Sequence, residues 1–356
     1  MEFLANYGLF LAKSLTFVAV VFVIVVLLSS LGSRKKGDKG HIEVIKLNEK
    51  YEDLREDLRE AMMDEEELKA HEKAEKKRLK DEKKAAKKAT KKDEPAETEL
   101  ITEVKGRVFV VDFDGDIKAS QVENLREEIT SILSIATPAD EVVIRLESGG
   151  GMVHTYGLAS SQLNRITKKG IKLTACVDKV AASGGYMMAC VANKIIAAPF
   201  AVLGSIGVVA QVPNLHKLLK KNDIDYDIYT AGKYKRTVTV LGENTEEGKQ
   251  KFVEDLHDTH DLFKGFVKTH RPSVDVEAVA NGDVWYGSKA IEVNLVDEVA
   301  TSDEYLFEKM AVADVYSVHY KLKKSLPEKF GMAAQASADK LLLTWWDRLH
   351  SQRWFQ

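Results

Sequence analysis

The 356-residue chain has little of what marks several common classes of protein. It has two cysteines, Cys176 and Cys190, each inside an apolar run, and we interpret both as small buried hydrophobic residues. It has no G-x-G-x-x-G fingerprint and no P-loop lysine followed by Ser or Thr, so its glycine loops carry no nucleotide-binding signature. It also has no cluster of metal ligands and no ATPase motif. The sequence therefore predicts neither a metal nor a cofactor.

Charge is nearly balanced, at a formal net charge of −3, so basic residues matter locally. Residues 72–92 carry eleven Lys and Arg against four acidic residues and show no apolar stripe. This is typical of a solvated helix or a disordered tether, with an arm against anionic lipid headgroups as the alternative. We expect no nucleic-acid partner.

Upstream of this basic segment, residues 47–61 show the three-four spacing of a heptad seam, which predicts a short coiled coil or a partner helix. The apolar positions are Leu47, Tyr51, Leu54, Leu58 and Ala61.

Residues 15–31 form an uninterrupted run dominated by Val, Leu, Ile and Phe. Extended upstream to Leu9, the run is long enough to cross the hydrocarbon core, so it predicts a single transmembrane anchor. No small-x-small cleavage site follows, which favours an anchor over a cleaved signal peptide. Positive charge is denser after the run, from Arg34 to Lys39, than before it. The positive-inside rule then favours a cytoplasmic catalytic part, and we leave the side of the membrane open.

From Arg107 onward, apolar strand-like runs alternate with helix-length segments, without internal duplication. The segments are 108–113, 122–135, 142–146, 156–166, 173–177 and 195–198. Such alternation predicts an α/β fold with a largely parallel sheet. A long helix is expected at 246–268, with an apolar stripe typical of a core or oligomer contact.

One serine, Ser183, stands between an apolar run at 172–177 and a helix-like run at 187–192. A side chain at the first turn of a helix has unpaired N–H groups and the positive end of the helix dipole beneath it, which suits a nucleophile. Gly184 and Gly185 let a substrate backbone approach closely. A helix-capping serine is the alternative interpretation.

A glycine loop, Gly149 to Gly151, follows the apolar run at 142–146. Its N–H groups, together with that of Gly184, are able to form a two-donor hole for the oxyanion of a tetrahedral intermediate. By itself such a loop is a weak signal, because ordinary turns use the same residues.

A third element, Gly232 to Arg236, follows a strand-like run at 225–230. A serine nucleophile needs a base, and the histidines, His260 among them, lie in polar contexts where we expect exposure. Lysine takes that role when it is neutral, which burial and positive neighbours on the same loop favour for Lys235. A solvated turn lysine is the alternative.

Four motifs in order carry a family resemblance: Ser148-Gly149-Gly150-Gly151, Ala182-Ser183-Gly184-Gly185-Tyr186, Leu203-Gly204-Ser205-Ile206-Gly207-Val208 and Gly232-Lys233-Tyr234-Lys235. They resemble the signal peptide peptidase A family of Ser/Lys proteases, which shares the ClpP/crotonase fold. We accordingly divide the chain into four parts. These are a transmembrane anchor (1–33), a charged helical, coiled-coil or disordered linker (34–103), a Ser/Lys peptidase domain (104–310) and a C-terminal extension (311–356). The aromatic and basic tail at 341–354 suits a packed helix or an interfacial membrane contact.

The resemblance implies Ser183 as nucleophile and Lys235 as general base, with the N–H groups of Gly184 and Gly150 as the oxyanion hole. Ser205 is a candidate supporting residue near the cleft, with a strand-turn serine bonded to backbone as the alternative. The family forms homo-oligomeric rings in which neighbours share the active site, so the lysine acts within one chain or across a contact.

The expected function is therefore that of a serine endopeptidase anchored in the bacterial inner membrane, which cleaves signal-peptide remnants or unfolded segments. One alternative is an acyl-CoA-binding enzyme of the crotonase type, which has no use for an aligned Ser and Lys. The other is a non-catalytic, membrane-anchored scaffold. Gly149 favours the scaffold, because the family usually has proline there and glycine adds unfolded-state freedom, on the order of 0.4 to 1 kcal/mol.

Overall fold

The computed structural model describes residues 7–10, 13–14, 16–17, 40–64, 66–68, 71 and 106–322. The apolar run at 15–31 lies almost wholly outside these residues, and the basic segment at 72–92 and the tail at 341–354 lie wholly outside them. The predictions made for these three segments therefore stay predictions. In the part of the chain that the structure describes, no helix combines the length and the apolar character needed to cross a bilayer.

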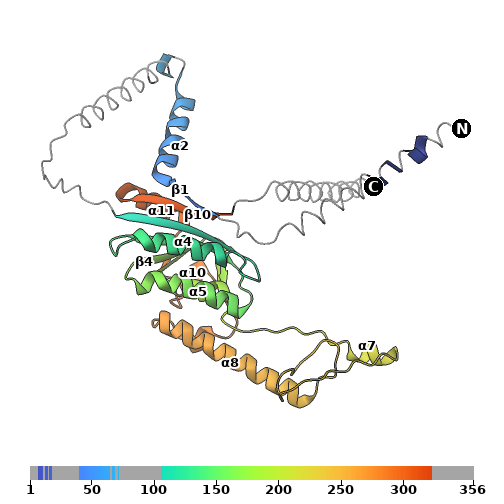
Figure 1. The fold of residues 1–356 in the computed structure, drawn as a ribbon. Coiled ribbons are helices and arrows are strands. Elements are labelled where there is room, and N and C mark those ends of the chain that lie inside the picture. Colours follow the sequence, from blue (N-terminus) through green and yellow to red (C-terminus); the bar gives the residue numbers. More distant parts are fainter. Residues whose placement is uncertain are drawn as a thin grey trace, which may run out of the picture. The chain divides into compact units, whose positions relative to one another are not determined.

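Residues Ile42–Tyr320 form one of two compact units of the chain and are built on a ten-stranded sheet (Figure 1). The main path of the sheet runs β1-β10-β2-β3-β4-β6-β9. Its strands are β1 (His41–Lys46), β10 (Asp314–Lys321), β2 (Arg107–Gly115), β3 (Glu141–Ser148), β4 (Lys172–Val177), β6 (Lys194–Ala197) and β9 (Glu298–Val299). From β10 to β9 every neighbouring pair is parallel. The expected α/β fold with a largely parallel sheet is confirmed.

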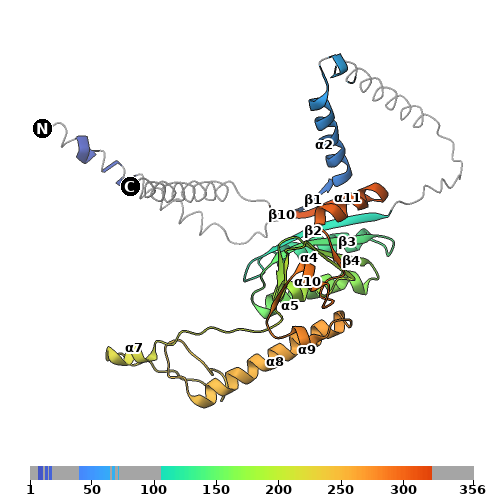
Figure 2. The same cartoon turned by 180° about the vertical axis from the view of Figure 1, so that it is seen from behind.

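Helices α4 (Val122–Ile135) and α5 (Val153–Lys168) pack over the main core on one face of the sheet (Figures 1 and 2). Strands β2 and β3 are buried along most of their length. Strands buried on both faces read as continuous apolar runs instead of alternating ones, which explains their Val, Ile and Leu content. Phe109, Ile129 and Leu163 belong to this core.

A smaller apolar cluster lies on the other face, where α11 (Ser302–Val312) and α2 (Leu47–Met62) contribute side chains. The helix expected at 47–61 is thus confirmed as α2, and Leu47 is buried in this cluster. The seam residues Leu54 and Leu58 are exposed. The seam therefore leaves most of its apolar side chains available to a partner helix.

Three short strands branch from the main path: β5 (Val180–Ala182), β7 (Val202–Gly204) and β8 (Val284–Tyr286). Strand β5 pairs in parallel with the end of β3, where Ala181 lies opposite Ser148, and also with β7. Strand β7 pairs antiparallel with β8. Because β5 leads directly into α6 (Gly184–Ala189), this pairing places Ser183 beside the loop that follows β3.

Residues 207–245, here called the arm, leave the domain after β7 (Figures 1 and 2). The arm carries the short helix α7 (His216–Lys221), which has no buried residue. The prediction of a strand at 225–230 is wrong, since these residues are exposed and have no regular secondary structure. A short segment of strand-like composition forms a strand only where neighbouring strands offer backbone partners and a face to pack on, and the arm offers neither.

Helix α8 (Glu246–His270) confirms the helix expected at 246–268. It begins at Thr245, whose side chain accepts the N–H of Gly248 and so satisfies one of the free donors of the first turn. Its amino-terminal half lies beside the arm, and its carboxyl-terminal half returns to the domain, where Phe263 and Val267 are buried (Figure 2). Two short helices follow, α9 (Val276–Val279) and α10 (Gly287–Ala290).

Candidate active site

Ser183 occupies a sharp turn between β5 and α6. Its backbone has φ 52° and ψ −117°, a left-handed conformation that is uncommon for residues other than glycine and that concentrates at functional sites. The turn is held by its N–H, which donates to the carbonyl oxygen of Gly204 at 2.8 Å. Ser183 is the N-cap residue of α6, as the alternative interpretation expects, but its side chain makes no capping hydrogen bond. A strained strand-to-helix turn with an uncommitted hydroxyl is the geometry of an exposed nucleophile.

The glycine loop after β3 lies directly against Ser183. Gly150 has φ +87°, and a Cβ on it would lie 2.6 Å from the Gly184 nitrogen and 2.8 Å from Ser183 Cβ. A Cβ on Gly185 would lie 2.4 Å from the carbonyl oxygen of Ser148. At Gly149, by contrast, a Cβ would meet no atom within 4 Å. Glycine is therefore required where the two loops touch, and position 149 has room for a side chain.

The N–H groups of the two loops differ in what they bind. Gly150 donates to Ser148 Oγ at 3.1 Å, so its N–H is used within the loop. Within the described chain, the N–H groups of Gly151 and Gly184 make no hydrogen bond, and both residues line the cavity that contains Ser183. In this structure the free donors beside Ser183 are thus those of Gly184 and Gly151.

The cavity around Ser183 has a volume of about 520 Å³. It is lined by Gly151, Met152, Val153, Ser183, Gly184, Met187, Ser205, Gly207, Val208, Val209, His260, Phe263, Asn281 and Gly282. Its walls are mostly apolar. Ser205 lies in the same cavity at φ 50°, and its N–H donates to the carbonyl oxygen of Asp283 at 2.6 Å. The Ser205 hydroxyl makes no hydrogen bond within the described chain, so the alternative of a side chain bonded to backbone does not describe it.

Lys235 does not line this cavity. The neighbouring Lys233 pairs with Glu247 in the first turn of α8, Nζ to Oε1 at 2.7 Å, and Lys235 itself is exposed. From Glu247 to His260, the first residue of α8 that lines the cavity, the helix rises roughly 20 Å at 1.5 Å per residue. A four-carbon side chain does not cover that distance. Within one chain, the structure brings together Ser183 and the two glycine loops but not Lys235.

His260 is a cavity residue that the sequence analysis placed among exposed histidines, and that prediction is wrong. It lines the cavity from α8, and its Nε2 atom is buried without a hydrogen-bond partner. The signal for this position was its spacing, because His260 precedes Phe263 by one helical turn and so shares the inward face of α8. Asn281, another polar lining residue, donates its side-chain N–H to Asp283 at 2.8 Å.

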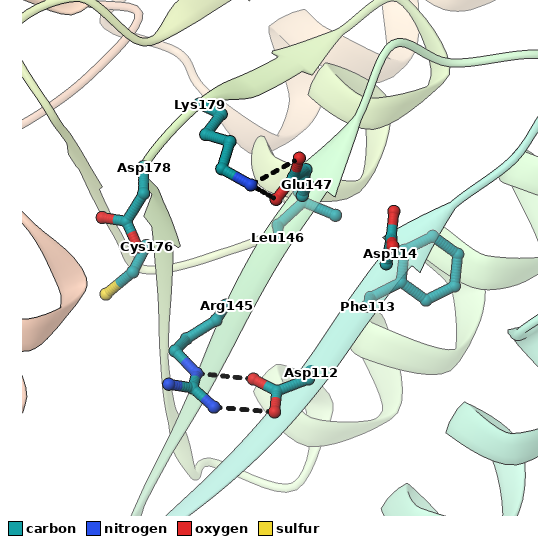
Figure 3. A pocket seen from close by; sticks show the side chains of 9 residues that line it. All are labelled: Asp112, Phe113, Asp114, Arg145, Leu146, Glu147, Cys176, Asp178 and Lys179. Carbon is teal, nitrogen blue, oxygen red and sulfur yellow. Dashed lines mark hydrogen bonds and ion pairs between the residues drawn. The ribbon is translucent and has the colours of Figure 1, made fainter. Parts of the chain in front are cut away.

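A second cavity, about 280 Å³, opens at the carboxyl-terminal ends of β2, β3 and β4 (Figure 3). Two ion pairs cross it: Arg145 binds Asp112 at 2.5 and 2.7 Å, and Lys179 contacts Glu147 at 2.9 and 3.1 Å. Burial raises the pKa of Cys176 to about 12, so its thiol stays protonated and unreactive. These groups join neighbouring strands, and none of them is an activated nucleophile.

Comparison with known proteins agrees with the fold and the motifs. The model of the peptidase family S49 N-terminal region matches residues 2–163, and the peptidase family S49 model matches residues 165–316. The "Probable protease SohB" of Haemophilus influenzae is 52% identical over 341 residues, covering 96% of each chain. The "Probable protease SohB" of Buchnera aphidicola subsp. Acyrthosiphon pisum is 48% identical over 343 residues, covering 96% of this chain and 97% of the relative.

Among solved structures, the membrane-bound stomatin-specific protease 1510-N in complex with a substrate peptide is similar to this chain. The identity is 15%, the TM-score is 0.38, and the match covers 64% of this chain and 96% of the other. The resemblance drawn from four short motifs is confirmed by the family models and by relatives that span nearly the whole chain. These two relatives, each named a probable SohB protease, match nearly the whole chain. The chain therefore belongs to peptidase family S49.

Proposed function

We propose that this protease is a serine endopeptidase with Ser183 as its nucleophile and Lys235 as its general base. The observation that carries the proposal is the state of Ser183. The backbone of Ser183 has a positive φ, and its hydroxyl makes no capping hydrogen bond to α6. The residue lines a 520 Å³ cavity, with the unpaired N–H groups of Gly184 and Gly151 beside it. A helix start and a glycine loop that converge on one hydroxyl supply both the nucleophile and the donors that acyl transfer needs.

In the proposed reaction, Ser183 Oγ attacks the carbonyl carbon of the scissile peptide bond while neutral Lys235 takes the hydroxyl proton. The carbonyl oxygen becomes the oxyanion, which accepts the N–H of Gly184 and an N–H of the glycine loop. The same proton then passes from Lys235 to the leaving amine, and the peptide bond breaks. Lys235 then deprotonates a water that attacks the acyl carbon, and it passes this proton to Ser183 Oγ as the bond between Oγ and the acyl carbon breaks.

Lys235 comes from a neighbouring copy in this proposal. Glu247, which pairs with Lys233 on the loop of Lys235, lies roughly 20 Å along α8 from the cavity wall of its own chain. The arm is also rich in exposed apolar side chains, with Val209 80% and Tyr229 91% exposed. Exposed apolar surface of this kind marks a protein interface. A homo-oligomeric ring in which each arm crosses to the next copy would cover the arm and complete each site at once.

The proposed substrates are extended peptides, such as signal-peptide remnants or unfolded segments, because the cavity walls are apolar and include Met152, Met187 and Phe263. The proposed location is the bacterial inner membrane, held by one transmembrane helix at 15–31 and in contact with lipid. That helix rests on the sequence pattern, and the side of the membrane on which the domain stands is left open.

Reconstitution from two inactive variants tests nucleophile, base and assembly together. We expect Ser183→Ala and Lys235→Ala each to abolish cleavage of an unfolded peptide and labelling by a serine-directed acylating probe. Lys221→Ala, which removes the same charge from the exposed helix α7 of the arm, should keep both. Mixed by dissociation and reassembly, the two inactive variants should recover roughly a quarter of wild-type activity, since that share of sites joins an intact Ser183 to an intact Lys235.

Four results would contradict parts of this proposal. Cleavage by the Ser183→Ala variant would show that Ser183 is not the nucleophile. Cleavage by the Lys235→Ala variant would show that Lys235 is not the general base. Failure of the mixed variants to recover any activity would place Lys235 within its own chain. Absence of labelling in the wild-type protein would favour an acyl-CoA-binding enzyme or a non-catalytic scaffold.

A further inference from the structure

A buried hydrogen-bond chain lies beneath the glycine loop, outside the Ser183 cavity. Ser148 is 2% exposed and Tyr156 is 0% exposed, and their hydroxyl oxygens are 2.5 Å apart. Ser148 Oγ also accepts the N–H of Gly150 at 3.1 Å and is within donating distance, 3.1 Å, of the carbonyl oxygen of Gly115. Tyr156 Oη is likewise within donating distance, 2.7 Å, of the carbonyl oxygen of Asp116. The chain thus joins the glycine loop to the turn that follows β2.

Each of the two hydroxyls has one proton, and the carbonyl oxygens of Gly115 and Asp116 only accept. Ser148 donates to Gly115 or to Tyr156, and Tyr156 donates to Asp116 or to Ser148. In either arrangement a lone pair of Ser148 accepts the N–H of Gly150, and Ser148 Oγ stays in contact with Tyr156 Oη. Bonds aligned head to tail polarise one another, and in a dry interior each is stronger than in water.

Tyr156 touches both halves of the proposed oxyanion hole. Through Ser148 its hydroxyl holds the N–H of Gly150 inward, and the next N–H along the loop, that of Gly151, is free at the cavity. Its ring lies under the nucleophile turn, since a Cβ on Gly184 would be 2.5 Å from Tyr156 Cγ. The ring is itself packed edge-on against Phe113, with centroids 6.4 Å apart. One side chain therefore sets the spacing between the two free donors.

We propose that Tyr156, acting through Ser148, is a positioning residue for the oxyanion hole. This inference rests on the proposed function. It assigns the inward N–H of Gly150 to support of the loop, and the free N–H groups of Gly151 and Gly184 to the oxyanion. Loss of the Tyr156 hydroxyl frees the peptide between Gly149 and Gly150 to turn, which moves the Gly151 donor away from the place where charge develops.

Tyr156→Phe removes one oxygen and keeps the ring, so it tests the chain with little change in packing. Removal of a whole oxyanion donor costs on the order of 10²- to 10³-fold in kcat, and we expect displacement of one donor to lower kcat by at least about tenfold, with KM within about twofold of wild type. Tyr305→Phe is the matched control, because Tyr305 is also buried and donates to Glu141 on the other face of the sheet. It should lose stability without losing kcat.

A readout that a purely structural role would not move is the affinity for peptide boronic acids, which form a tetrahedral adduct with a serine nucleophile. In Tyr156→Phe the inhibition constant should weaken by the same factor by which kcat/KM falls. Ser148→Ala interrupts the same hydrogen-bond chain at its other hydroxyl. Because the two hydroxyls act as one unit, kcat of the double variant should be no lower than kcat of either single variant.

The outcomes separate this inference from the proposed function. If the wild-type protein neither cleaves peptides nor reacts at Ser183, the proposed function fails and this inference fails with it. If the wild-type protein is active and both Tyr156→Phe and Ser148→Ala keep kcat within twofold, the proposed function stands and the positioning role is overturned. Effects of the two substitutions that multiply in the double variant would also overturn it.

Discussion

Glu128 should control how the stability of the domain depends on pH. It lies on α4, is 5% exposed, and accepts the N–H of Tyr320 at 2.8 Å through Oε1. Burial raises the pKa of this carboxyl from its ordinary 4.5 to about 7, with a smaller contribution from the negative charge of Asp112. The hydrogen bond from Tyr320 opposes this rise, because it favours the ionised form.

The sign of the effect follows from proton binding in the two states. Between pH 4.5 and 7 the unfolded carboxyl has lost its proton while the folded one keeps it, so the folded state binds more protons and stability falls as pH rises. Below pH 4.5 the carboxyl is protonated in both states, and it does not destabilise the folded state. Above pH 7 it is ionised in both states, and the destabilisation is complete. A pKa shift of this size corresponds to about 3 kcal/mol at 1.36 kcal/mol per pH unit.

Glu128→Gln removes the charge and keeps an oxygen that can accept from Tyr320. We expect it to raise the free energy of unfolding by about 1 to 3 kcal/mol at pH 8 and to leave it nearly unchanged at pH 4. Urea unfolding followed by circular dichroism across this pH range measures the difference. Glu123→Gln, on the exposed side of the same helix, is the control. A gain that is equal at pH 4 and pH 8 would refute the reasoning, because it could not come from titration.

Three further predictions concern the core and the cavity. Arg271→Ala should lower the free energy of unfolding by about 3 kcal/mol in urea titrations, because Arg271 is 5% exposed and binds Asp297 at 2.7 and 3.0 Å. Gly185→Ala should lower both the melting temperature and peptide cleavage, since its Cβ would meet the carbonyl oxygen of Ser148 at 2.4 Å. His260→Phe should raise the free energy of unfolding by about 1 kcal/mol, because it removes an unpaired buried nitrogen; a clear loss would show that the nitrogen has a partner.

Elements of the buried core can be predicted from the sequence, because burial imposes its own pattern. The segment expected at 122–135 is α4, and the run at 142–146 lies within β3. Short strands cannot be predicted in this way. Strands β5, β7 and β8 have three residues each, too few to show a period. The segment 225–230 has the tyrosine, isoleucine and threonine typical of a strand but no strand to pair with.

The candidate site divides in the same way. Ser183 and the glycine loop can be predicted because each follows a strand, and parallel strands bring their carboxyl-terminal ends together. Which glycine N–H faces the cavity cannot be predicted, since it depends on a hydrogen bond between Gly150 and Ser148. The position of Lys235 depends on the path of an arm with few packing contacts, and neither composition nor periodicity encodes that path.

Among the strands that the structure describes, β10 is synthesised last, yet it lies between β1 and β2. A nascent chain therefore carries two unsatisfied strand edges until residues 314–321 have left the ribosome, and assembly of the sheet waits for that segment. Premature termination ahead of this segment would release a polypeptide that retains the nucleophile turn but exposes adhesive backbone on both sides of the gap. Aggregation, not partial activity, is the expected fate of such a product.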